Sequence, residues 1–128
     1  MIVRHAQAAP GDPDELRPLT PRGREDAREL GRRLRNEGLE PDAVLSSPLL
    51  RARETARELT RDSDVEPGPD ERLAPGATAD DVRAAVAGKG ETVVVVGHQP
   101  DCGRITATLT GGPEPPFPPA GMVVLELL

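Results

Sequence analysis

The chain has 128 residues, a length that fits one compact domain and leaves no room for a second core of ordinary size. It carries 22 acidic against 16 basic residues, and the formal net charge of −6 gives a field that repels polyanions. One phenylalanine, with no tryptophan or tyrosine, leaves no platform on which bases could stack. We therefore expect a single domain over residues 1–128 and no nucleic-acid partner.

The cysteine count and the hydropathy limit the compartment, the metals and the membrane contacts that we expect for the protein. Cys102 is the single cysteine and cannot form an internal disulfide, and together with two histidines it makes a poor zinc set. No apolar run approaches the roughly 20 residues needed to span a bilayer, and no charged leader precedes the first strand-like residues at Met1. We expect a cytoplasmic monomer that needs no metal or cofactor and binds no membrane, with Cys102 buried in its core.

The first half of the chain alternates strand and helix signals. Residues 1–5 are predicted to form a strand, and residues 6–18 an exposed loop rich in proline and acidic side chains. Thr20 and Pro21 form an N-cap with proline at the first helical position, and the helix they open stops at Gly38. Its core-facing side is predicted from the spacing of Ala27, Leu30, Gly31 and Leu34.

A second buried strand is predicted at residues 43–46. Ser47 and Pro48 repeat the cap signature, so we interpret Ser47 as the N-cap of the next helix. One face of that helix is lined by Leu49, Ala52, Ala56 and Leu59. The turn-rich stretch after it contains a weak strand signal at residues 64–66.

The second half continues the alternation. Thr78 and Asp81 have the spacing of a capping box that opens a short helix, and the β-branched run 92–96 is typical of a central strand covered on both faces. Asp101 opens a further helix, a proline-rich loop follows, and residues 122–128 are predicted to close the chain as a strand. Strands alternating with helices indicate an α/β fold with a mostly parallel sheet between helices.

Three of the predicted strands end in residues suited to phosphate chemistry. The first ends in Arg4 and His5, the second is followed within one turn of helix by Arg51, and the central strand is followed by His98. In open α/β sheets, ligands bind outside the carboxyl ends of the strands, so both imidazoles and two guanidiniums are expected at one edge.

Phosphoryl transfer uses both of these residue types. The transition state gathers negative charge on three equatorial oxygens, which two arginine forks can stabilise. A neutral imidazole can attack phosphorus if its other nitrogen is held as a hydrogen-bond donor, for example by a backbone carbonyl. The pattern therefore predicts a phosphate site with a nucleophile; a metal at the two histidines is disfavoured because the guanidiniums would repel it.

These motifs resemble those of the histidine phosphatase superfamily. The resemblance rests on Ile2-Val3-Arg4-His5, on Ser47-Pro48-x-x-Arg51 followed by Thr55-Ala56, and on Val96-Gly97-His98-Gln99-Pro100. The short length, the segment from Arg17 to Gly23 and the lack of an inserted helical cap most resemble the SixA-type phosphohistidine phosphatases. The resemblance implies a phosphoglycerate mutase-like three-layer α/β/α sandwich, with a mostly parallel sheet that contains one antiparallel strand.

The resemblance also assigns roles. It implies that His5 is the phosphorylated nucleophile, that Arg4 and Arg51 clamp the phosphate from exposed positions, and that His98 is the second imidazole on it. Arg17 is a candidate at the substrate rim, although an ion pair with Asp12 or Asp14 explains it equally well.

Two positions depart from the pattern of the superfamily. Ala6 stands where glycine is most frequent, and Ala74-Pro75 stands where phosphoglycerate-mutase-type members present a glutamate as general acid. The nearby carboxylates, which have no assigned role, are Asp70, Glu71, Asp80 and Asp81. A site without an acid favours a leaving group that needs little help, such as the imidazole of phosphohistidine on a protein.

Two other functions remain open from the sequence. One is hydrolysis of a small phosphomonoester, and the other is phosphoryl binding without turnover. Retention of His5 argues against the binding module, since binding alone does not require a nucleophile.

Overall fold

The computed structural model describes residues 1–127. The elements in chain order are β1 (Ile2–Arg4), η1 (Asp14–Leu16), α1 (Pro21–Asn36), β2 (Ala43–Ser46), α2 (Leu50–Leu59), β3 (Gly68–Pro69), η2 (Glu71–Leu73), α3 (Ala79–Val86), β4 (Val93–Gly97), α4 (Asp101–Thr110) and β5 (Met122–Val123), where η marks a 3-10 helix. No helix within residues 1–127 is both long enough and apolar enough to cross a membrane.

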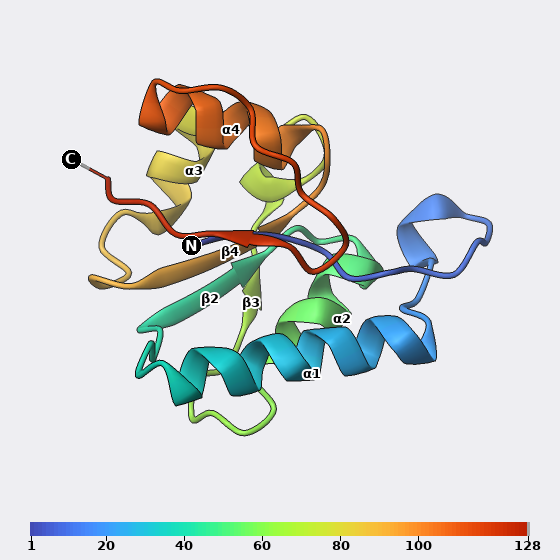
Figure 1. Cartoon of the computed structure of the whole chain (residues 1–128). Helices are drawn as coiled ribbons and strands as arrows, with labels where there is room; N and C mark the ends of the chain where they lie inside the picture. Colours follow the sequence, from blue (N-terminus) through green and yellow to red (C-terminus); the bar gives the residue numbers. More distant parts are fainter. Residues whose placement is uncertain (128) are drawn as a thin grey trace.

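The strands form one sheet in the order β3-β2-β4-β1-β5. Strands β3, β2, β4 and β1 are parallel, and β5 pairs antiparallel with β1 at the edge. Helices α3 and α4 cover one face of the sheet, while α1 and α2 cover the other (Figure 1). The predicted three-layer sandwich with one antiparallel strand is therefore confirmed, and the valine-rich strand is central as expected.

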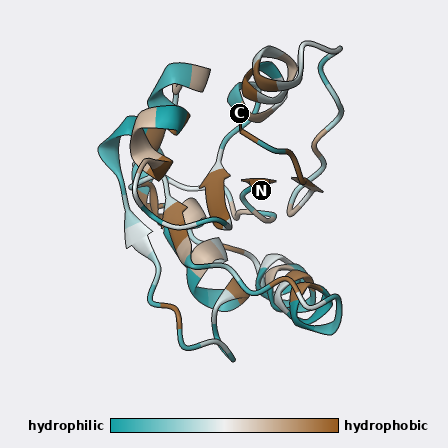
Figure 2. Ribbon diagram, turned by 90° about the vertical axis from the view of Figure 1, so that its left-hand side faces the viewer, coloured by the Kyte–Doolittle hydropathy of each residue, from teal (hydrophilic) through white to brown (hydrophobic). Residues whose placement is uncertain are grey.

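Alternation along each strand divides the core into two clusters. In β1, Ile2 packs against α3 and α4, whereas Val3 packs against α1 and α2. In β4, Val95 faces α3 and α4, and its neighbours Val94 and Val96 face α1 and α2. The apolar strands consequently lie between helices that present their apolar sides inward (Figure 2).

Two of the predicted helix N-caps are present. The hydroxyl of Thr20 accepts a hydrogen bond from the amide of Gly23 and caps α1, with Pro21 as its first residue. Thr78 and Asp81 exchange side-chain and backbone hydrogen bonds in the expected capping box of α3. Both caps depend on contacts within three residues, which a local sequence pattern records.

Three predicted elements differ from the structure. Helix α2 begins at Leu50, and its N-cap Leu49 makes no side-chain hydrogen bond, so the prediction of Ser47 as N-cap is wrong. The third strand is at Gly68–Pro69 rather than at residues 64–66, since register with β2 selects the paired residues there. Strand β5 is limited to Met122–Val123, and Leu128, the end of the predicted strand, lies outside the described residues.

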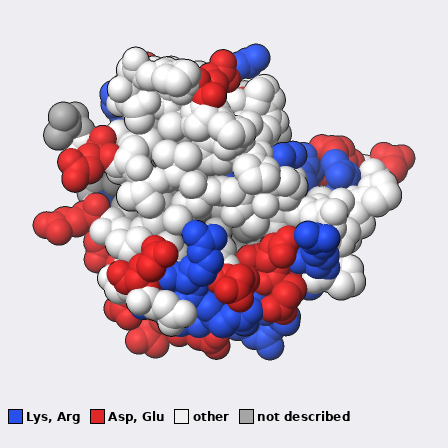
Figure 3. Space-filling view, viewed as in Figure 1, with Lys and Arg blue, Asp and Glu red and all other residues white. Residues whose placement is uncertain are grey.

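Helices α1 and α2 approach each other closely enough to exclude a side chain at Gly31, where a Cβ atom would lie 2.4 Å from the carbonyl oxygen of Leu59. Arginines of α1 form ion pairs with glutamates of both helices, among them Arg24 with Glu54 and Arg32 with Glu25. Positive and negative side chains are interspersed over α1, along the lower part of Figure 3, so the arginine-rich stretch is a charge-balanced helix surface.

Candidate active site

The carboxyl ends of β2, β4 and β1 lie side by side and bring the predicted residues together. Arg4 pairs in register with Gly97, and the amide of His5 donates a 3.0 Å hydrogen bond to the carbonyl of Gly97, directly before His98. On the other side of β4, the amide of Ser47 donates to the carbonyl of Val96 at 2.9 Å. The sequence prediction that the strand ends converge is thus met by the topology of the sheet.

His5 is held in the form that a nucleophile requires. Its Nδ1 lies 2.8 Å from the carbonyl oxygen of Ala6. Because a carbonyl only accepts, the neutral ring carries its proton on Nδ1 and keeps a lone pair on Nε2. Burial, and secondarily the positive charges of Arg51, Arg4 and Arg17, lower the pKa of His5 to about 4. The imidazole is therefore neutral at pH 7.

The alanine that replaces the usual glycine after the histidine causes no backbone strain. Ala6 is fully buried, and its amide donates a 2.9 Å hydrogen bond to the hydroxyl of Thr55. Within residues 1–127, Ala120 is the non-glycine residue with positive φ, so Ala6 has no need of the left-handed region.

His98 faces His5 at the end of the neighbouring strand. The two ring centroids are 5.2 Å apart with an interplanar angle of 59°. His98 is 5% exposed, and its Nε2 lies 2.8 Å from the hydroxyl oxygen of Ser47. Burial is the main cause that lowers the pKa of His98 to about 4, and the adjacent His5 and Arg51 act in the same direction. Both imidazoles are thus neutral at pH 7.

Two arginines are fixed by oxygen atoms around this histidine pair. Arg4 donates from Nη1 to the carbonyl of Phe117 at 2.9 Å. Arg51 donates from Nη1 to the main-chain oxygen of Asp14 at 3.0 Å, and from Nη2 to the carboxylate of Asp14 at 3.2 Å. Arg51 is 8% exposed, so the expectation of an exposed guanidinium is wrong for it: the first turn of α2 and η1 enclose the side chain.

Arg17 is half-buried, and its side chain forms hydrogen bonds with other residues of the protein. Its Nε donates to the carbonyl of Ala9 at 2.9 Å, and its Nη1 pairs with Asp14 at 3.1 Å. Of the two partners considered from the sequence, the structure therefore selects Asp14. Arg17 is also one of the positive charges that lower the pKa of His5.

Asp14 is the carboxylate that reaches the arginines, and sequence reasoning recognised only part of its role. The three-residue spacing to Arg17 indicated that ion pair, whereas the contact with Arg51 joins residues 37 positions apart and leaves no local signal. The hydrogen bond from Arg17, and then the proximity of Arg51, hold the pKa of Asp14 below its ordinary value. An ionised carboxylate at neutral pH cannot serve as the proton donor.

Three of the four carboxylates near the position of the superfamily's acid bind other groups. Asp70 pairs with Arg72, Asp81 caps α3, and Asp80 pairs with Arg83. A further carboxylate, on the buried Asp101, accepts a 2.8 Å hydrogen bond from the amide of Gly76 and ties this loop to the start of α4. These contacts supply no acid to the histidine pair.

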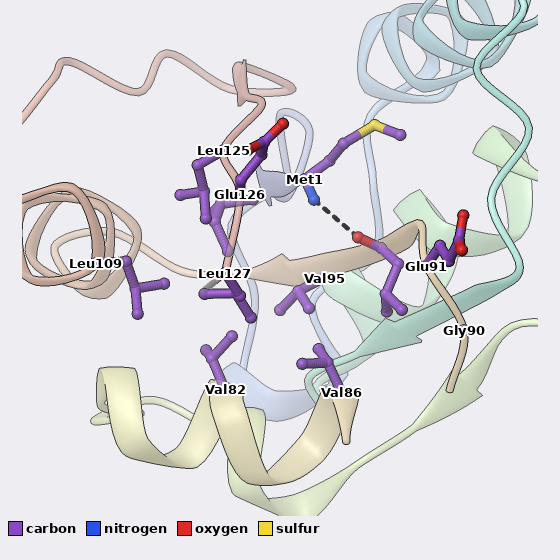
Figure 4. Close-up of a pocket in the computed structure, with 12 residues that line it drawn as sticks. Met1, Val82, Val86, Gly90, Glu91, Val95, Leu109, Leu125, Glu126 and Leu127 are labelled. Carbon is purple, nitrogen blue, oxygen red and sulfur yellow. Dashed lines mark hydrogen bonds between the residues drawn. The ribbon is translucent and has the colours of Figure 1, made fainter. Parts of the chain in front are cut away.

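A cavity away from the histidine pair lies at the opposite end of the strands. It has a volume of about 530 Å³ and lies beside Met1 and Val93, where β1 and β4 begin. Val82 and Val86 of α3 point into it, opposite Leu127 (Figure 4). Its lining contains no histidine, arginine or cysteine, so it lacks the groups for the predicted chemistry.

Two further features are the burial of Cys102 and the spacing of the side chains that could bind a metal. Cys102 is buried on α4 as expected, and burial raises the pKa of its thiol to about 12, which makes it unreactive at neutral pH. In the described part of the chain, no three His, Cys, Asp or Glu side chains are grouped as a metal site would require.

Comparison with known proteins points to the same chemistry. The sequence profile of the histidine phosphatase superfamily (branch 1) matches residues 1–75. The phosphohistidine phosphatase SixA of Escherichia coli is 35% identical over 125 residues, which cover 91% of this chain and 76% of that protein. A solved structure of the protein histidine phosphatase SixA complexed with tungstate superposes with a TM-score of 0.83 and 28% identity, covering 93% of this chain and 81% of the other.

A second group of relatives matches about half of the chain. The mitochondrial serine/threonine-protein phosphatase Pgam5 of Drosophila persimilis is 40% identical over 67 residues, which are 52% of this chain and 23% of that protein. The chain thus spans about a quarter of the length of these relatives. On the profile match and on the similarity to SixA over nearly the whole chain, this protein belongs to the histidine phosphatase superfamily.

Proposed function

We propose that the protein is a phosphohistidine phosphatase that acts through a covalent phosphohistidine on His5. The observation that carries this proposal is the hydrogen bond from Nδ1 of His5 to the carbonyl of Ala6, which leaves the lone pair of Nε2 available for attack. The similarity to SixA, whose name states its activity on phosphohistidine, supports the choice of substrate.

In the first step, Nε2 of His5 attacks the phosphorus of the substrate. A P–N bond to His5 forms while the P–N bond to the substrate imidazole breaks. The substrate ring carries a proton on its other nitrogen, so it departs as a neutral imidazole and requires no proton from the enzyme. Because burial keeps the ring of His5 neutral at pH 7, with its one proton on Nδ1, Nε2 needs no prior deprotonation.

In the second step, water attacks the phosphorus of phospho-His5. The P–N bond breaks, the electron pair returns to Nε2, and the protons of the water remain with the released phosphate and solvent. His5 is restored in its starting form, and its Nδ1–H still donates a hydrogen bond to the carbonyl of Ala6.

Charge on the three equatorial oxygens is stabilised by the groups around His5. We assign Arg4 and Arg51 to the phosphate clamp, His98 to a neutral N–H donor on the phosphoryl oxygens, and Arg17 to the rim of the site. All of these residues belong to one chain, so the proposed reaction requires no second subunit.

The environment favours a phosphoramidate over a phosphate ester. An alkoxide leaving group needs a proton at departure, and the one carboxylate on the clamp, Asp14, is ionised at neutral pH. A small phosphomonoester is consequently the poorer substrate. A protein that displays phosphohistidine fits the chemistry, and we propose it as the partner.

Trapping the intermediate tests the proposal. During turnover of a phosphohistidine protein labelled on phosphorus, alkaline quenching should preserve label on the enzyme, and acid quenching should release it. The His5→Ala variant should be folded, by circular dichroism, and should neither carry label nor turn over. Full turnover by His5→Ala, or an acid-stable adduct, would exclude His5 as the nucleophile.

A further inference from the structure

Asp14 binds Arg51, which the proposed function assigns to the phosphate clamp, and Arg17, which it assigns to the rim of the site. One carboxylate oxygen lies 3.2 Å from Nη2 of Arg51, and the other lies 3.1 Å from Nη1 of Arg17. The main-chain oxygen of Asp14 takes Nη1 of Arg51 at 3.0 Å. Both terminal nitrogens of the buried Arg51 therefore bind oxygens of this single residue.

The contact is built so that it can be broken at low cost. The side chain of Asp14 is 60% exposed, so its carboxylate is hydrated again as soon as it leaves the arginines. The pair with Arg17 joins two solvent-accessible groups and contributes little free energy, whereas in the pair with the buried Arg51 only the carboxylate is open to water. Residue 14 also begins η1, a 3-10 helix of three residues within the long loop between β1 and α1.

We propose that Asp14 is an internal anion that holds the phosphate clamp in the absence of substrate and is displaced when a phosphoryl group binds. This inference rests on the proposed function, because it takes Arg51 as a phosphate ligand and Arg17 as its neighbour at the rim of the site. The carboxylate keeps the two guanidiniums near each other, and the incoming phosphoryl oxygens take over the N–H groups that it releases. Asp14 thereby sets the affinity of the site for oxyanions.

Charge supports this role for a carboxylate at this position. Three arginines influence the pKa of His5, and their mutual repulsion would oppose a preformed clamp. Asp14 offsets part of that charge, and its effect extends to His98, whose pKa it raises slightly against the other causes. A phosphoryl dianion brings more negative charge than the carboxylate does, so it competes effectively for the same donors.

Equilibrium binding of inorganic phosphate at pH 8, measured by calorimetry, tests the inference without turnover. Replacing the carboxylate in Asp14→Asn should tighten phosphate binding about 3- to 30-fold, since the competing ion pairs are lost. Asp14→Ala should tighten it as well. Glu15→Gln removes the same charge from the adjacent residue of η1 and should change the affinity less than twofold.

The outcomes separate this inference from the proposed function. Weaker or unchanged binding in both Asp14 variants would overturn it, and weaker binding would show that Asp14 only positions the arginines. Equal tightening in Glu15→Gln would overturn it in favour of a general field effect. Arg51→Ala should abolish binding in every background; if it does not, the phosphate clamp itself, and with it the proposed function, is wrong.

Discussion

The hydroxyl of Ser47 lies 2.8 Å from Nε2 of His98, so two buried side chains at the ends of neighbouring strands form one hydrogen-bonded pair. Ser47 also accepts a 3.2 Å hydrogen bond from the amide of Leu49. A hydroxyl accepts one hydrogen bond and still has its own proton to donate, so Ser47 can donate to Nε2 of the neutral ring. The pair therefore fixes the orientation of the imidazole that we assign to the phosphoryl oxygens.

We expect Ser47→Ala to lower kcat/KM for a phosphohistidine substrate by roughly 10- to 100-fold, the size of effect expected when a buried hydrogen bond worth about 1–3 kcal/mol is removed. Ser46→Ala is the matched control, because Ser46 is also buried but its hydroxyl donates to the carbonyl of Ser47. Nitrogen NMR shifts of His98 should move only in Ser47→Ala. Equal loss of activity in the two variants would indicate a purely structural role.

Arg51 should contribute both to catalysis and to stability. Loss of a charge-assisted donor at a phosphoryl site typically lowers the rate by roughly a hundredfold or more, and we expect this for Arg51→Ala. A lower melting temperature should accompany it, since the side chain is buried and links α2 to η1. Arg53→Ala, on the exposed side of the same helix, should change neither quantity. Full activity of Arg51→Ala would remove Arg51 from the clamp.

The two histidines should titrate far below the ordinary range. Their pKa values are lowered to about 4, mainly by burial, whereas an unperturbed histidine titrates near about 6.5. The unfolded chain thus binds these protons more readily, and the stabilising contribution of the neutral rings is present above pH 6.5 and lost as the pH falls toward 4. NMR titration of the ring carbons should give two midpoints near 4, and a midpoint near 6.5 in the folded protein would contradict the burial of that ring.

The parts of this structure that the sequence could predict depend on neighbours in the chain. The cap at Thr20, the capping box at Thr78 and the valine run of β4 each have a pattern within a few residues, and each is present. The convergence of His5 and His98 followed from the rule that parallel strands place their carboxyl ends at one edge.

The errors concern residues whose roles are set by distant partners. Ser47 before a proline carries a cap signal, but the hydroxyl binds His98, 51 residues away. Asp14 lies in a loop with no pattern of its own, and the folding of α2 beside η1 brings Arg51 to it. Strand β3 is two residues long and includes a proline, so its pairing with β2 defines it.

Close packing of the helices beneath the sheet gives a stability prediction. In Gly31→Ala the new Cβ would lie 2.4 Å from the carbonyl oxygen of Leu59, so α1 and α2 must move apart. Overpacking of this kind costs about 1–3 kcal/mol in the free energy of unfolding. Gly68→Ala is the control, because nothing lies within 4 Å of its added Cβ. Denaturant unfolding should separate the two variants; equal midpoints would mean that the helices can relax without cost.

Substrate preference distinguishes the proposed phosphohistidine phosphatase from an esterase of the same superfamily. We expect kcat/KM to be highest for a phosphohistidine protein, lower for p-nitrophenyl phosphate and lowest for an alkyl phosphate such as 3-phosphoglycerate. The reason is the leaving group: imidazole leaves neutral, nitrophenolate is stable without a proton, and an alkoxide requires a donor. At the position of the superfamily's acid, the side chains of Ala74 and Pro75 have no acidic proton to donate.

The same comparison tests whether a donor has been overlooked. Glu71→Gln, Asp80→Asn and Asp81→Asn, assayed with the alkyl phosphate and the phosphohistidine protein, should leave the ratio of the two rates unchanged. Asp80 and Asp81 engage Arg83 and the start of α3, so neither carboxylate is held toward the histidine pair. If the alkyl phosphate were the best substrate, and one of these variants abolished that preference, the residue would be a general acid and the assignment to phosphohistidine would fail.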